Sequence, residues 1–239
     1  LPDIVQEHKI DLVVANAENI AGGTGATPAL IEELRCCGIN LFTLGNHSWR
    51  KKEMASGIDA LPDVARPANY THFAPGKGVA MHTLSDGARA AVINLIGRVY
   101  LEPANCPFAQ VDIELQALAP ETRIILVDMH AEATSEKGAM AWYLDGRCTA
   151  VVGTHTHVPT ADERILPNGT AFITDVGMCG PYNAILGVDK DLVINRLVTG
   201  MPVKWEVAGG AAQFCAALIE ADPATGRAVS IERIHKLES

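Results

Sequence analysis

The sequence has few aromatic residues, no excess of positive charge and no long apolar run. Aromatic side chains make up 5% of the 239 residues, and the three tryptophans form no stripe of the kind that stacks single-stranded nucleic acid. Acidic residues outnumber basic ones by 28 to 19, so the surface should repel the phosphate backbone of long nucleic acids. The longest apolar runs fall well short of the roughly 20 residues that span a bilayer. We therefore expect neither a long nucleic acid partner nor a membrane span.

The six cysteines lack the regular spacing of a disulfide framework, and none forms a Cys-x-x-Cys pair. Cys36 and Cys37 are adjacent, and adjacent cysteines bridge only with strained geometry. This pattern is typical of reduced thiols, and we expect a cytoplasmic location.

The length and composition fit one ordinary globular domain. Hydrophobic residues make up 48% of the chain and charged residues 20%, and Gly and Pro are scattered along it. A chain of this length can bury a substantial core. We find no internal repeat and treat residues 1–239 as a single domain, while the oligomeric state stays open.

Short apolar runs recur along the first two thirds of the chain, with helical patterns between them. Continuous runs of this kind suit strands that are buried on both faces. Between the first two runs, Thr27 can cap a helix, Pro28 suits its first position and Gly38 can end it, which makes a βαβ unit. The expected strands are 12–15, 41–44, 91–96, 124–127 and 150–152, and two further helices are expected at 110–118 and 135–144, the second capped by Ser135.

The region 163–234 has a different pattern, with β-rich segments joined by turns such as Pro-Asn-Gly at 167–169. The strands expected there are 164–166, 171–174, 203–207, 211–219 and 228–233. Together the two patterns predict an α/β fold with two packed sheets and helices outside.

Polar side chains follow four of the expected buried strands. In open α/β sheets, ligands bind beyond the carboxyl ends of the strands, so these positions are the ones to inspect. His155 and His157 are two residues apart, and on an extended segment they would point to the same side. The four motifs are Asn-Ala-Glu-Asn at 16–19, Gly-Asn-His at 45–47, Asp-Met-His at 128–130 and Gly-Thr-His-Thr-His at 153–157.

Each motif alone has a simpler interpretation. A Glu-Asn pair after a strand is most often a turn or a helix cap, and a single histidine such as His130 is more often a satisfied core residue than a ligand. The pair His155 and His157 is a stronger signal, because two imidazoles on one face need a shared partner. Four of the eight histidines lie in these motifs, and independent accidents would not select the same edge of a sheet.

The donors favour a metal centre. One carboxylate, two or more amides and three or more imidazoles, without cysteine, suit iron, manganese or zinc. They are too many for one tetrahedral ion, whereas two ions roughly 3.5–4 Å apart would use them all. Such a pair activates water and neutralises phosphate oxygens, so a small phosphorylated substrate fits this acidic chain. His47 is then the candidate acid that protonates the departing alkoxide.

These motifs resemble the calcineurin-like metallophosphoesterases, which carry Asp and Asn-His motifs at strand ends and finish with a Gly-His-x-His type element. Longer strings resemble the YmdB-type bacterial phosphodiesterases over almost the whole chain. They are NAEN (16–19), TLGNHSW (43–49), RPAN (66–69), INLIGR (93–98), DMHAEATSEK (128–137), GTHTHVPTADERIL (153–166) and ITDVGMCGPY (173–182). The resemblance implies a calcineurin-like four-layer sandwich of two mixed sheets flanked by helices.

The resemblance also implies roles for the site residues. Glu18 would bridge the two ions and His47 would act as the general acid. The other ligands would divide between the ions, with Asn19 and His157 on one and Asn46, His130 and His155 on the other. The implied metals are iron or manganese, and the implied substrates are cyclic nucleotides with a 2′,3′- or 3′,5′-cyclic phosphodiester.

The chain departs from the wider superfamily in two ways. Glu18 stands where an Asp is usual and Ser48 replaces a common acid, although both features are similar to the YmdB-type subgroup. Members of the group also begin with a strand whose Gly-Asp motif binds the first metal, and residue 1 corresponds to the end of the helix that follows. We therefore expect the first β-α unit to be missing and the first ion to be weakly held, since Asp3 and Asp11 lie on the wrong side.

Two other functions stay open at this point. A metal-dependent amide hydrolase also uses His-x-His pairs, although such pairs usually lie on an early barrel strand. A non-catalytic regulator would keep metal or nucleotide binding and act through partners. Among secondary positions, Asp175 follows an expected strand and could support a ligand histidine, and the three tryptophans suit core or rim positions.

Overall fold

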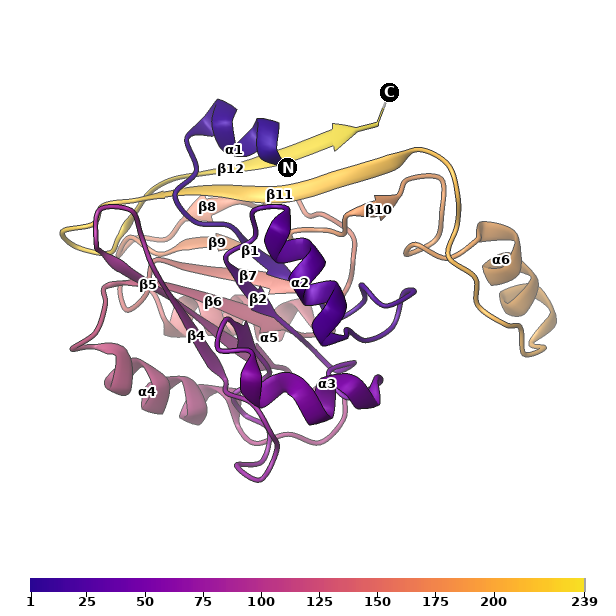
Figure 1. Cartoon of the computed structure of the whole chain (residues 1–239), viewed down its shortest axis with the longest axis horizontal. Coiled ribbons are helices and arrows are strands. Elements are labelled where there is room, and N and C mark those ends of the chain that lie inside the picture. Colours follow the sequence, from indigo (N-terminus) through magenta and orange to yellow (C-terminus); the bar gives the residue numbers. More distant parts are fainter. Residues whose placement is uncertain (239) are drawn as a thin grey trace.

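A computed structural model describes residues 1–238, and its centre is a six-stranded mixed sheet (Figure 1). The strand order is β4-β5-β6-β7-β9-β8. β5, β6, β7 and β9 run parallel, whereas β4 and β8 pair antiparallel at the two edges. The carboxyl ends of the four parallel strands therefore lie at one edge of the sheet. The strands are β4 (Val79–Thr83), β5 (Arg89–Ile96), β6 (Ile124–His130), β7 (Ala150–Thr154), β8 (Arg164–Ile165) and β9 (Ala171–Ile173).

Two smaller sheets complete the strand arrangement. β1 (Val14–Asn16), β2 (Leu41–Thr43) and β3 (Val64–Ala65) form a parallel sheet in that order. β11 (Ala212–Ala221) and β12 (Ala228–Leu237) form a long antiparallel hairpin that β10 (Gly180–Pro181) extends. In Figure 1 this hairpin runs along the top of the molecule, beside the first helix.

The helices flank the sheets. They are α1 (Pro2–His8), α2 (Pro28–Cys36), α3 (Lys52–Gly57), α4 (Pro107–Leu118), α5 (Thr134–Tyr143) and α6 (Lys190–Thr199), with a 3₁₀ turn η1 (Ile58–Ala60). Within residues 1–238, none of them is long and apolar enough to cross a membrane. The prediction of a mixed α/β fold with more than one sheet and helices outside is confirmed.

Buried side chains form clusters on both sides of the six-stranded sheet and of the small parallel sheet. One cluster joins Ile93 and Leu95 of β5 to Val111 of α4 and Met140 of α5. A second joins Phe42 of the small sheet to the helices α2 and α3. A third lies between the two sheets and contains Leu41, Ala65, Ala80 and Val92. The two sheets are thus held face to face by their own apolar side chains, which brings the ends of β1 and β2 near those of β6 and β7.

The helix expected at 27–37 forms for the reasons that the sequence suggested. The Thr27 hydroxyl accepts a hydrogen bond from the Leu30 amide at 3.3 Å, and Pro28 occupies the first turn. Ile31 is fully buried on its inner face. Gly38 follows the end of the helix with φ of +97°, a conformation that glycine adopts without strain.

Three local expectations were wrong. Ser135 is not a cap, because α5 begins at Thr134 and its N-cap residue is Ala133. Residues 203–207 form no strand, and only Val207 pairs, as an isolated bridge with Val188. The helix α6 was not anticipated in a region expected to hold only strands. Its N-terminus is capped by the Asp189 side chain, and it projects away from the sheets at the right of Figure 1.

Candidate metal centre

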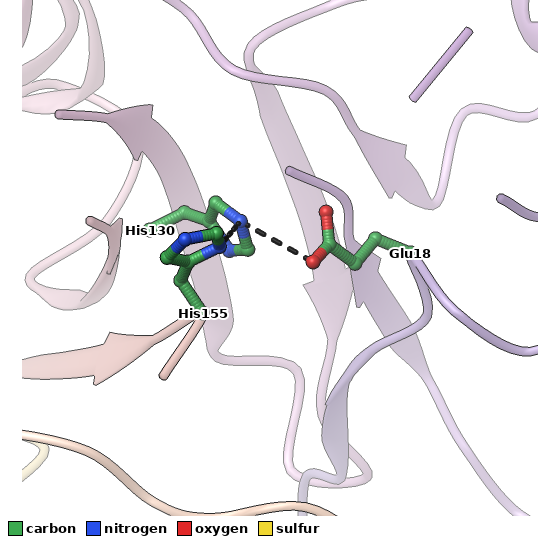
Figure 2. Close-up of side chains that lie close together, drawn as sticks. All are labelled: Glu18, His130 and His155. Carbon is green, nitrogen blue, oxygen red and sulfur yellow. Dashed lines mark hydrogen bonds and ion pairs between the residues drawn. The ribbon is translucent and has the colours of Figure 1, made fainter. Parts of the chain in front are cut away.

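The ends of β1, β6 and β7 bring three of the predicted ligands together. Glu18 follows β1, His130 is the last residue of β6 and His155 comes directly after β7. Potential ligand atoms of these three side chains all lie within 4.8 Å of one another. Figure 2 shows the two imidazole rings side by side, with the carboxylate of Glu18 facing them.

Hydrogen bonds determine which ring nitrogen of His130 carries the proton. The other nitrogen faces this cluster with its lone pair. The Thr154 hydroxyl donates to Asp128 Oδ1 at 2.7 Å, so its oxygen must accept from His130 Nδ1, which lies 2.9 Å away. Nε2 is then the unprotonated nitrogen. Asp128 itself accepts from Thr43, Thr154 and Asn16, so it is held as an acceptor. This chain of contacts orients the His130 lone pair toward Glu18.

The neighbours of His130 Nε2 also present lone pairs. His155 Nε2 lies 3.0 Å from the acceptor-only carboxylate of Glu132, so the proton of this ring is on Nε2 and Nδ1 is free. His155 Nδ1 lies 3.1 Å from His130 Nε2. Glu18 Oε1 lies 3.3 Å from the same His130 nitrogen. Asn46 Oδ1 approaches the same nitrogen at 2.9 Å. Four acceptors facing one another repel unless a cation lies among them, so these residues fit a metal ion.

Gly45 makes room for this arrangement. A Cβ atom at this position would lie 2.2 Å from Glu18 Oε2 and 2.3 Å from His130 Nε2. Any other residue would thus occupy the space between these candidate ligands, which explains the glycine two residues after β2.

A second group of side chains adjoins the first. Asn19 and His47 follow β1 and β2, and His157 lies in the loop after β7. In the amide orientation that satisfies both ends of Asn19, Nδ2 donates to His47 Nδ1 at 2.7 Å and Oδ1 lies 3.2 Å from His157 Nε2. The His47 amide donates to Glu18 Oε2 at 3.2 Å, which joins the two groups. We call Glu18, Asn46, His130 and His155 the His130 half, and Asn19, His47 and His157 the Asn19 half.

Burial sets the protonation of these groups. It lowers the pKa of His130 well below its usual value, and it is also the main cause of the lowered pKa of His47 and His157. Burial raises the pKa of Glu18 to about 7, opposed by the hydrogen bond from the His47 amide. Neutral imidazoles suit metal ligation, and a nearby cation would favour the charged form of Glu18.

The loop that carries the two late histidines is not extended, so the expected reason for their convergence was wrong. His155 has φ of 94° and His157 has φ of 66°, both in the left-handed region. Between them, Thr156 donates from its amide and its hydroxyl to Asp175 Oδ2, at 3.1 and 2.6 Å. The histidines converge because the backbone turns around this anchored threonine.

Lys137 completes the anchor and was not singled out from the sequence. It is fully buried on α5, and its ammonium donates to Asp175 at 2.8 Å and to Thr156 at 3.0 Å. Asp175 therefore supports the two candidate ligand histidines through Thr156 and not by direct contact. A signal for Lys137 existed, since it shares one helical face with the apolar residues Met140 and Ala141.

All of the predicted site residues thus gather at one edge of the fold. Comparison with known proteins places this chain in a family. Residues 1–234 match the model of a family described as YmdB-like protein. The chain belongs to the YmdB-like family. A relative from Bacillus subtilis is 47% identical to this YmdB-like chain over 234 residues, which are 98% of the chain and 88% of the relative. That relative is named 2′,3′-cyclic-nucleotide 2′-phosphodiesterase.

Solved structures of similar chains share this fold. A hypothetical protein from Thermus thermophilus matches with a TM-score of 0.91 and 40% identity, over 100% of this chain and 91% of the other. A protein from Mycoplasma pneumoniae, described as a novel phosphatase, matches with a TM-score of 0.91 and 34% identity, over 99% of this chain and 86% of the other. The resemblance drawn from the sequence is confirmed, and so is the prediction of an enzyme of the metallophosphoesterase class.

Proposed function

We propose that this YmdB-like protein is a dinuclear metal-dependent phosphodiesterase that hydrolyses small cyclic nucleotides with 2′,3′- or 3′,5′-cyclic phosphodiesters. The observation that carries the proposal is the convergence of acceptor atoms around His130 Nε2, which calls for a cation. The name of the Bacillus subtilis relative supports the substrate class. The buried clusters on both sides of the two sheets support the four-layer calcineurin-like arrangement.

The His130 half would hold one ion, and Asn19 and His157 would hold the other, with Glu18 shared between them. Iron or manganese suits this set of carboxylate, amide and imidazole donors. Bound ions would supply a water of lowered pKa and would neutralise charge on the phosphate oxygens.

His47 supplies the proton that the leaving alkoxide requires. The form that acts as the acid is the imidazolium. In that form Nδ1–H donates to the side-chain oxygen of Asn19, 2.7 Å away once the amide is turned to accept, and Nε2–H is the proton that is delivered, which leaves a neutral ring. The same contact fixes the plane of the ring, while the His47 amide is tied to Glu18. The acid is therefore positioned by Glu18 and Asn19, in the loop after β1.

Replacement of His47 tests the proposal. In protein loaded with manganese or iron, His47→Ala should lower turnover of cyclic nucleotides by about 10²–10⁴-fold, the usual range for general acid catalysis, while the metal content stays unchanged. His82→Ala, on β4 away from the centre, serves as the matched control. Substrates should include 2′,3′- and 3′,5′-cyclic nucleotides, a phosphomonoester and an amide.

Three outcomes would contradict the proposal. Full activity of His47→Ala would remove this residue from the mechanism. Turnover of the amide alone would indicate an amide hydrolase. Tight nucleotide binding without hydrolysis of any substrate, in protein with full metal content, would indicate a non-catalytic regulator.

A further inference from the structure

A cavity of about 440 Å³ adjoins the candidate metal centre and has no part in holding metal. Its walls include Trp49, Tyr70, Glu102 and Asn105. Both aromatic side chains are partly exposed, and their ring centroids lie 6.4 Å apart with the planes tilted by 39°. The rings are thus too strongly tilted for a parallel stack on each other, and both contribute surface to the same cavity.

Two contacts place this cavity next to the reacting groups. The Tyr70 hydroxyl donates to the Gly45 carbonyl at 3.3 Å, and Gly45 is the residue that backs onto Glu18 and His130. Trp49 lies in the same turn as His47, two residues further along the chain. A molecule with one end at the metal centre can therefore place its other end between these walls.

The chemistry of the walls favours a neutral, flat, hydrogen-bonding group over a phosphate. Glu102 is the charged residue among those that line the cavity, and no lysine or arginine accompanies it. A phosphate is repelled by this carboxylate, whereas a nucleobase stacks on aromatic side chains regardless of its identity. A cyclic nucleotide with its phosphodiester at the metal centre would then have its base in the cavity.

We propose that this cavity is the nucleobase subsite and that Glu102 makes it selective for bases with an exocyclic amino group. The inference deepens the proposed function and rests on it. A carboxylate accepts hydrogen bonds only, so it pairs with the amino groups of adenine, guanine or cytosine. Uracil presents a single N–H between two carbonyl oxygens, and these would face the carboxylate unfavourably. Asn105 can donate or accept and discriminates less.

Variants of Trp49 and Glu102 test the inference. We would measure kcat/KM for 2′,3′-cyclic AMP, 2′,3′-cyclic UMP and the base-free 2′,3′-cyclic phosphate of methyl riboside. Trp49→Leu should lower the value for both nucleotides by roughly 5- to 150-fold, the range of one lost base stack, and leave the base-free substrate unchanged. Trp49→Phe should recover most of the loss. Trp142→Leu, which removes an exposed tryptophan of α5 outside the cavity, is the matched control.

Glu102→Gln tests the selection between bases. The ratio of kcat/KM for cyclic AMP over cyclic UMP should fall by about tenfold, because a glutamine amide can donate to the uracil carbonyls. An unchanged ratio would overturn the role of Glu102. An equal loss on all three substrates in Trp49→Leu would overturn the subsite itself.

The design separates this inference from the proposed function. If the unaltered protein hydrolyses none of the three substrates, the proposed function fails, and calorimetric binding of 2′,3′-cyclic AMP to the same variants decides the subsite. Weaker binding in Trp49→Leu than in Trp142→Leu would still support the cavity as the base site. Equal binding would refute it.

Discussion

The two halves of the candidate centre differ in how firmly the fold holds them. In the His130 half, Glu18 and His130 are buried, and His130 is tied through Thr154 to the buried carboxylate of Asp128. In the Asn19 half no residue is buried: all three are partly exposed and belong to loops, as Asn46 and His155 of the His130 half also do. His47, the candidate acid, lies in this second half.

The difference suggests a division of labour. A set of candidate ligands with two buried members, one of them held by a chain of hydrogen bonds, is suited to retain an ion during turnover. Side chains on partly exposed loops can instead contact a substrate that enters from solvent and release its product. The His130 half should therefore control metal content, and the Asn19 half should control chemistry.

The largest effect is expected from the loss of a ligand in the His130 half. His130→Ala should remove bound metal and lower turnover on the order of 10³-fold, because metal ions contribute several kcal/mol of charge stabilisation. His157→Ala should keep the ion of the His130 half. Metal analysis of the two variants beside the exposed control His235→Ala checks this. Equal metal loss from both would show that the halves do not differ.

A second change removes the anchor of the loop that carries His155 and His157. Lys137→Met leaves Asp175 buried without its counter-charge and should cost about 3–5 kcal/mol of unfolding free energy. The loop it anchors carries one histidine of each half, so affinity for both ions should fall. Denaturant unfolding and metal titration give the two readouts, with Lys190→Met on the exposed α6 as the control. Recovery of stability in the double variant with Asp175→Asn is expected, and a fully stable single variant would refute the anchor.

The smallest effect is expected from a change behind His130, which should affect one half of the centre and not the other. Asp128→Asn removes one acceptor from the chain that fixes the His130 tautomer and should weaken metal binding by about 10- to 100-fold in the His130 half alone. Burial raises the pKa of Asp128 to about 6, while the three hydrogen bonds that it accepts oppose that rise. Competition with a metal-sensing dye measures the change, and Asp86→Asn in an exposed turn is the control. Weakening of the second ion to the same extent would contradict the assignment.

Strand positions were predictable where the apolar pattern was strong. The strands β5, β6 and β7 begin close to the expected residues, since continuous buried runs have few alternative structures. The helix α6 escaped prediction because Lys190–Thr199 is rich in β-branched residues, and none of its side chains is buried to reveal a helical face.

The gathering of the site residues could also be predicted, because parallel strands end at a common edge. The contacts that hold them could not. The pairing of Lys137 with Asp175 joins α5 to the loop after β9, and no local pattern encodes a contact between such distant positions. The turn at His155 and His157 was misjudged because histidine adopts positive φ only where surrounding contacts enforce it.

The left-handed backbone at His155 and His157 carries a consequence for redesign. Each such residue stores roughly 1–3 kcal/mol of conformational strain, which glycine would relieve. A sequence selected for foldability alone would thus drift toward glycine at both positions and lose two imidazoles. Thermostabilised versions of this enzyme should take their gains from other parts of the chain.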